Sequence, residues 1–159
     1  MTYWKLFKAK CCSVDLKSTT KEETLAEILD NLVAGGPLDA ELKERAHQGL
    51  LDRERLATTG VGQSVAIPHI QVVGLESAVA SLCVQPTGVE WSAVDGEPVQ
   101  LFFTVLRPAQ AGPRHDPATH LEMMRWIARL GRDRDFRSFA LQARTRKDLV
   151  DLLKEMSHV

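Results

Sequence analysis

The fold is decided by one stretch of the chain, Thr59-Gly60-Val61-Gly62-Gln63-Ser64-Val65-Ala66-Ile67-Pro68-His69. Gly60 and Gly62 bracket a turn, because glycine permits positive φ and a close approach of the backbone to a neighbour. The apolar run 65–67 is typical of a short buried strand. Pro68 has no amide donor for the ladder, so we expect the strand to end there and to leave His69 at its mouth. Strand ends of an α/β sheet often carry chemistry, which makes His69 the first candidate.

The glycine spacing does not match the dinucleotide-binding fingerprint. That fingerprint has its glycines after a strand and before a helix, and it contains a third glycine. Here both glycines precede the strand. On the local pattern alone, a tight turn that leads into a core strand, with His69 as a loop residue, explains the stretch as well as a functional site does.

Composition restricts the class of protein. The chain has 159 residues, 44% of them hydrophobic and 26% charged, which is typical of one ordinary globular domain. Its net charge of −1 predicts no binding to nucleic acid or to an anionic membrane. The apolar runs are too short to span a bilayer, and the first residues do not resemble a signal peptide. The cysteines, Cys11, Cys12 and Cys83, form no disulfide or paired zinc pattern, which favours a reducing cytoplasm.

Hydrophobic periodicity predicts helices at both ends of the chain and strands between them. The expected helices follow a hydroxyl N-cap at 18–20, Asp39, the Pro/Gly-rich loop 108–117 and Thr145. Strands are expected at 78–84 and 99–106, with a short edge strand at 14–16 and a loop at 71–76. The run 99–106 is apolar on both faces, which predicts a central strand covered by helices. Gly131 is expected to end the third helix. The pattern is that of a single-domain α/β sandwich.

Three side chains suggest chemistry on phosphate. His69 follows a strand, His120 lies in the first turn of an expected helix, and Arg53 lies in the last turn of another. Imidazole is a nucleophile at neutral pH, and a second imidazole can bind a phosphoryl oxygen or fix the tautomer of the first ring. Arginine binds phosphate oxygens bidentately, and a helix N-terminus favours the same anion. Each residue also has a purely structural explanation: His69 as a loop residue, His120 as a first-turn residue and Arg53 as a helix-end cation.

Together these motifs resemble a known family. The stretch from Thr59 to His69 is similar to the signature of the mannitol, fructose and nitrogen-regulatory (PtsN-like) enzyme IIA domains of the bacterial phosphotransferase system. Arg53-Glu54-Arg55-Leu56 resembles the family's R-E-x-L element, and Thr119-His120-Leu121 resembles its second-histidine element. The resemblance extends over residues 14–156, with 1–13 as an N-terminal extension. It implies a central mixed β-sheet flanked by helices on both faces.

The resemblance also implies a function. His69 would accept a phosphoryl group from the histidine phosphocarrier protein and pass it to a cysteine of an enzyme IIB, or hold it as a regulatory signal to a kinase or transporter. His120 would stabilise the phosphoryl group and Arg53 would bind it. No metal or cofactor is implied. The nitrogen-regulatory type is favoured, and the sugar, if there is one, is not indicated.

The chain departs from the family at one position. A glycine usually follows Pro-His, and here the residue is Ile70. A branched side chain there is expected either to restrict the backbone beside His69 or to make a different apolar contact with a partner.

Two other functions remain open. The chain could be a binding module whose contacts depend on phosphorylation, with no onward transfer. A remote alternative is a metal hydrolase that uses His69, His115, Asp116 and His120, although the spacing from His115 to His120 is not that of a helical zinc pair. In the phosphocarrier interpretation, His115 is expected at the surface, near the site loop.

Overall fold

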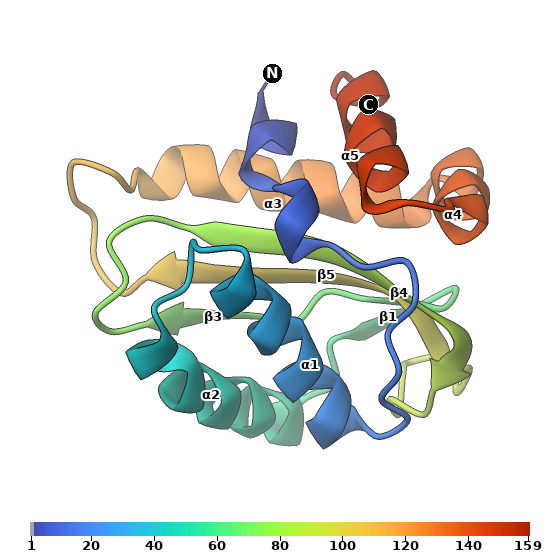
Figure 1. The fold of residues 1–159 in the computed structure, drawn as a ribbon, viewed down its shortest axis with the longest axis horizontal. Coiled ribbons are helices and arrows are strands. Elements are labelled where there is room, and N and C mark those ends of the chain that lie inside the picture. Colours follow the sequence, from blue (N-terminus) through green and yellow to red (C-terminus); the bar gives the residue numbers. More distant parts are fainter. Residues whose placement is uncertain (1) are drawn as a thin grey trace.

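A computed structural model describes residues 2–159 of the chain. A mixed sheet forms the middle layer and helices cover both of its faces (Figure 1). One face is covered by α1 (Lys21–Ala34) and α2 (Lys43–Leu56), and the other by α3 (Pro117–Arg132), α4 (Arg134–Gln142) and α5 (Arg146–Glu155). The predicted α/β sandwich is therefore confirmed.

The sheet is built around one central strand. Its strands are β1 (Gly60–Gly62), β2 (Val65–Ala66), β3 (His69–Val72), β4 (Val79–Val89) and β5 (Val99–Pro108). β4 pairs with β5 in antiparallel fashion, and β2 and β3 both pair with β5 in parallel. Since Val65 lies opposite Leu101 and His69 lies opposite Val105, β2 and β3 follow one another along one edge of β5.

The region after Pro68 differs from the prediction. The loop expected at 71–76 is partly strand, and His69 begins β3 instead of ending a strand. Pro68 interrupts the edge because it has no amide to donate, but its carbonyl still accepts a hydrogen bond from the amide of Val105 at 3.0 Å. The pairing with β5 therefore resumes at once, which fixes His69 in the sheet.

Register decides which face each side chain of β3 reaches. Side chains alternate across a strand, and His69 is opposite Val105, which packs in the core beneath α3. Ile70 is opposite Leu106, and both pack on the other side of the sheet, with α1 and α2. His69 and Ile70 therefore face different helical layers.

Helix ends follow the predicted chemistry in part. The Thr20 hydroxyl accepts a hydrogen bond from the amide of Glu23 and caps α1, and Thr145 caps α5 in a capping box with Asp148. Asp39 makes no side-chain cap and precedes a 3₁₀ turn, η3 (Ala40–Leu42), before α2 begins.

Two local predictions were wrong. Gly131 does not end α3, which continues to Arg132. Gly131 instead allows α3 to pack closely on the sheet, because a Cβ at this position would lie 3.3 Å from Cγ1 of Val65. No strand forms at 14–16, and only the preceding residue, Ser13, makes an isolated bridge, to Cys83.

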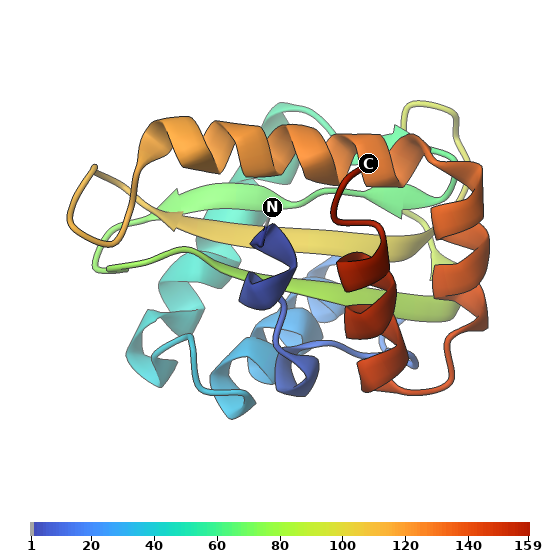
Figure 2. The same ribbon diagram turned by 90° about the horizontal axis from the view of Figure 1, so that it is seen from above.

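The described part of the N-terminal extension packs on the face of the sheet that α3 and α5 cover (Figure 2). It contains two 3₁₀ turns, η1 (Tyr3–Leu6) and η2 (Ala9–Cys11). Phe7 is buried between them, with its ring in edge-to-face contact with Phe103 at 6.3 Å and with Trp126 at 6.1 Å. Aromatic pairs at these distances add to the stability gained by burial.

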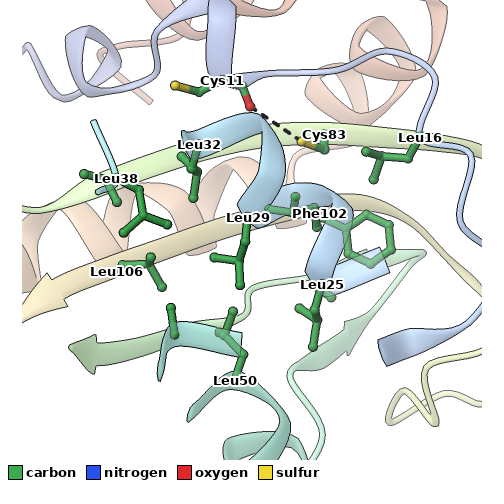
Figure 3. Packing of buried hydrophobic residues seen from close by; sticks show 14 of the residues in the cluster. Cys11, Leu16, Leu25, Leu29, Leu32, Leu38, Leu50, Cys83, Phe102 and Leu106 are labelled. Carbon is green, nitrogen blue, oxygen red and sulfur yellow. Dashed lines mark hydrogen bonds between the residues drawn. The ribbon is translucent and has the colours of Figure 1, made fainter. Parts of the chain in front are cut away.

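All the cysteines are free and buried. The Cys83 thiol points toward the carbonyl oxygen of Cys11 at 3.9 Å, inside the core between the sheet and α1 (Figure 3). Burial raises the pKa of the Cys12 thiol to about 11, and it raises the pKa of Cys11 and Cys83 as well. Neutral thiols are poor nucleophiles, so these residues behave as core side chains. Over residues 2–159, no helix is both long and apolar enough to cross a membrane.

Candidate functional site

A pocket of about 330 Å³ opens where β3, the end of β5 and the start of α3 meet. Its lining residues are His69, Arg107, His115, Pro117, His120, Leu121 and Met124. Two histidines that were expected to act together, His69 and His120, therefore line one cavity. Their convergence follows from the topology, because β3 runs parallel to β5 and α3 follows the loop after β5.

His69 is held by a main-chain bond. Its Nδ1 lies 2.6 Å from the carbonyl oxygen of Ile67. A carbonyl can only accept, so Nδ1 carries a proton, and in the neutral ring Nε2 carries the lone pair. The half-buried ring of His69 thus has a defined tautomer, with its nucleophilic nitrogen on the side of the ring away from that bond.

His120 belongs to the first turn of α3. Asp116 caps this helix by accepting a hydrogen bond from the amide of Ala118, and Pro117 occupies the first helical position, where its missing amide costs nothing. The pKa of His120 is lowered from 6.5 to about 4, mainly by burial and then by electrostatic interaction with Arg107, His115 and His69. His120 is therefore neutral at pH 7, and an incoming anion would oppose each of the charge effects.

Two residues of the pocket were missed in the sequence. His115 was expected at the surface but is only 6% exposed. A backbone bridge to Gly112 folds this loop inward, and the His115 ring packs edge-on against His120 with 5.3 Å between centroids. Arg107 comes from the end of β5, opposite Gln71. The sequence did contain a signal for Arg107, namely a cation at the end of a buried central strand. Binding sites of α/β sheets lie at such strand ends.

Arg53 does not line this pocket. It lies in the last turn of α2, and its guanidinium donates a hydrogen bond to the carbonyl of Ala57 at 2.6 Å. α2 packs on the face of the sheet that Ile70 reaches, whereas His69 points to the other face. The sequence could not reveal this, because the face of each β3 residue depends on where pairing resumes after Pro68.

Ile70 has an intramolecular contact. A Cβ on Gly49 of α2 would lie 2.8 Å from Cδ1 of Ile70, so the helix approaches the strand closely at this glycine. Ile70 is partly buried and packs against the core beneath α2. Its side chain therefore supports the strand that carries His69.

The site residues do not form a metal centre. Within residues 2–159, no three His, Cys, Asp or Glu side chains come together so that they could hold a metal ion. His69, Arg107, His115 and His120 instead offer imidazole nitrogens and a guanidinium around one cavity. Such groups suit an anion with several oxygens, above all a phosphoryl group.

Comparison with known proteins agrees with this chemistry. Residues 5–156 match the family model described as the phosphoenolpyruvate-dependent sugar phosphotransferase system, EIIA 2. The fructose-specific EIIA component of the phosphotransferase system of Haloferax volcanii is 30% identical over 144 residues, which cover 91% of this chain and 89% of the relative. A nitrogen regulatory protein of Bradyrhizobium diazoefficiens is 35% identical over 120 residues, which cover 76% of this chain and 73% of that protein.

A solved structure shares the fold. The mannitol enzyme IIA of Escherichia coli, in its complex with phosphorylated mannitol enzyme IIB, aligns with a TM-score of 0.71. The alignment covers 94% of this chain and 97% of that one, at 21% sequence identity. The predicted mannitol-type arrangement of sheet and helices is confirmed by this match.

Proposed function

The chain belongs to the EIIA 2 family of the phosphoenolpyruvate-dependent sugar phosphotransferase system, and from that premise we propose that it is a phosphocarrier whose acceptor atom is Nε2 of His69. The observation that carries the assignment is the bond from His69 Nδ1 to the carbonyl of Ile67. It leaves the lone pair on Nε2, in a ring that shares its pocket with other imidazoles and with Arg107.

The transfer is a displacement at phosphorus. The lone pair of His69 Nε2 attacks the phosphorus of a phosphohistidine on the histidine phosphocarrier protein, and the N–P bond of the donor breaks with its electrons returning to the donor imidazole. The proton on Nδ1 stays in place, and the positive charge that develops on the His69 ring is stabilised by the carbonyl of Ile67. In onward transfer, a cysteine thiolate of an enzyme IIB attacks the phosphorus on His69. The N–P bond breaks, and its electrons return to the His69 ring.

His120 acts as the phosphoryl stabiliser. It is neutral before transfer because burial and neighbouring cations disfavour its protonated form. The arriving phosphoryl group brings negative charge, which favours a hydrogen bond from the His120 ring and raises its pKa. His120 thus responds to the charge that His69 receives.

Two arginines supply positive charge. Arg107 already lines the pocket. Arg53 is the second phosphate-binding residue, and reaching the phosphoryl group requires it to leave the exposed carbonyl of Ala57. An exposed hydrogen bond of this kind contributes little to stability, so breaking it costs little free energy.

A phosphorylation assay tests the assignment. The protein is incubated with phosphorylated phosphocarrier protein, and we expect one acid-labile, alkali-stable phosphoryl group on His69. His69→Ala should abolish labelling, whereas His47→Ala, on α2 and outside the pocket, should label normally. Full labelling of the His69→Ala protein would overturn the proposal.

The nitrogen-regulatory type is the favoured subclass, supported by the relative at 35% identity. Here the phosphoryl group on His69 acts as a signal that changes binding to a kinase or transporter. Partners captured from a cytoplasmic extract by the unphosphorylated protein and lost on phosphorylation would support this subclass. Rapid transfer to the cysteine of a sugar-specific enzyme IIB would instead support a transport role.

A further inference from the structure

A buried carboxylate holds the beginning of the segment that leads to His69. Glu54 lies on α2, and its side chain is 4% exposed. It accepts a hydrogen bond from the amide of Thr59 at 3.1 Å and another from the Thr59 hydroxyl. Lys21 donates to the same carboxylate at 3.2 Å and compensates its charge.

The Thr59 hydroxyl both donates and accepts a hydrogen bond in this network. Besides donating to Glu54, it accepts a hydrogen bond from Nε1 of Trp91 at 3.2 Å. The ammonium of Lys21 lies over the ring of Trp91, 5.1 Å from its centroid. α1, α2 and Trp91 are thereby joined at Thr59, so its main chain has little freedom to shift.

The network continues along the main chain to the acceptor ring. The carbonyl of Thr59 accepts a hydrogen bond from the amide of Ile67 at 3.0 Å. The carbonyl of the same residue, Ile67, accepts the bond from His69 Nδ1 at 2.6 Å. Ile67 therefore connects the position of Thr59 with the orientation of the imidazole, and the path Glu54–Thr59–Ile67–His69 alternates hydrogen bonds with the main chain of Thr59 and of Ile67.

We propose that Glu54 is a positioning residue for His69: its carboxylate fixes Thr59, Thr59 fixes the main chain at Ile67, and the carbonyl of Ile67 holds the His69 ring as the Nδ1–H tautomer. This inference deepens the proposed function, since the tautomer determines whether Nε2 has a lone pair with which to attack phosphorus.

The first variant is Glu54→Gln in the full chain. Glutamine keeps the size and one acceptor oxygen, but its amide nitrogen cannot accept the Thr59 hydroxyl. The second variant, Thr59→Val, removes the hydroxyl and leaves both main-chain bonds of Thr59 available. Glu27→Gln is the matched control, because Glu27 on α1 also holds loop amides, those of Lys17 and Ser18, but has no hydrogen-bonded path to His69 within residues 2–159.

The ring tautomer is read directly from ¹⁵N shifts of the His69 imidazole over a pH titration. Wild type and Glu27→Gln should show Nδ1–H in the neutral form. Glu54→Gln should show a mixture that includes Nε2–H, with kcat for phosphoryl uptake reduced on the order of tenfold and KM for the donor unchanged. Thr59→Val should change the tautomer population and kcat in the same direction as Glu54→Gln, but by less.

A folded Glu54→Gln protein that keeps the wild-type tautomer and titration of His69 would overturn the inference. If that variant does not fold, Thr59→Val decides by the same two readouts. The tautomer is measured without phosphoryl transfer, so a His69 that is held as proposed but accepts no phosphoryl group would contradict the proposed function and leave the positioning role of Glu54 supported.

Discussion

The two chain segments that form the pocket are held in different ways. The segment 57–69, which supplies His69, is tied to Glu54, Trp91 and β5 by a continuous set of hydrogen bonds. The loop 109–116, which supplies His115 and leads to His120, is mostly exposed and is closed by the bridge between Gly112 and His115. Neither His115 nor His120 makes a side-chain hydrogen bond within residues 2–159, in contrast to His69.

The difference separates two tasks. A nucleophile must present one nitrogen in one direction, which main-chain hydrogen bonds can ensure. A group that stabilises arriving charge needs freedom to change its protonation and its partner, which a half-buried, unbonded ring retains. The rigid segment therefore fits the acceptor, and the looser loop fits the groups that respond to the acceptor's charge.

The largest expected effect comes from a methyl group in the rigid segment. In Gly60→Ala, the new Cβ would lie 2.7 Å from Cβ and 2.9 Å from Cα of Ala93, so main chain must move. We expect a loss of about 2 kcal/mol in the free energy of unfolding, measured by urea denaturation. Gly112→Ala in the looser loop meets nothing within 4 Å and should be nearly neutral. Equal losses in the two variants would remove the contrast between the segments.

The next largest effect is expected on the rate of phosphoryl uptake when the arginines are replaced. Arg107→Gln should slow phosphoryl uptake about tenfold, the loss of one charge-assisted hydrogen bond to phosphate. It should also raise the pKa of His120, because the positive charge of Arg107 helps to lower it. Arg53→Gln should slow uptake less and leave that pKa unchanged. NMR titration and rapid-quench kinetics measure both. A stronger kinetic loss in Arg53→Gln would make Arg53 the main phosphate ligand.

A smaller effect concerns acid stability. The folded state holds the pKa of His120 at about 4, below the unfolded value of 6.5, so the unfolded chain binds more protons between these values. The stabilising contribution is present above pH 6.5 and is lost as the pH falls toward 4. Because the ring is half exposed, we expect on the order of 1 kcal/mol. In chemical denaturation, His120→Gln should flatten this part of the pH profile, and the exposed-tail variant His158→Gln should not.

The smallest effect is expected at the helix cap next to the site. Asp116→Ala removes the acceptor for the amide of Ala118 and for the Thr119 hydroxyl. The first turn of α3 should fray, which faster amide exchange at 118–120 would report, with little change in overall stability. Thr145→Ala, which uncaps α5 far from the pocket, is the matched control. Faster exchange around His69 in Asp116→Ala would show that the two segments are coupled after all.

Much of the fold was predictable because it depends on local patterns. The apolar run 99–106 indicated the central strand, and Thr20 and Thr145 indicated the starts of two helices. The role of Gly131 was not predictable, because it depends on contact with Val65 across the layers. Nor was β3, because local pattern at Pro68 shows the interruption but not the renewed pairing with β5.

Site residues were predictable where a chemically suitable side chain follows a proline or a Pro/Gly-rich loop. His69 follows a proline and His120 follows a Pro/Gly loop, and both line the pocket. Arg107 was missed and His115 was expected at the surface, because their positions depend on strand register and on how the loop folds inward. Arg53 does not line the pocket, and its role in binding the phosphoryl group stays a prediction.

Because its cysteines are buried, the folded protein offers no reactive thiol to alkylating reagents. Cys11, Cys12 and Cys83 are buried and their pKa values are raised, so a maleimide fluorophore has no native target while the protein stays folded. Leu121 lines the pocket and is 52% exposed. A dye attached through Leu121→Cys would consequently sit alone at the rim, where its emission would follow in real time the arrival of a donor protein and its departure.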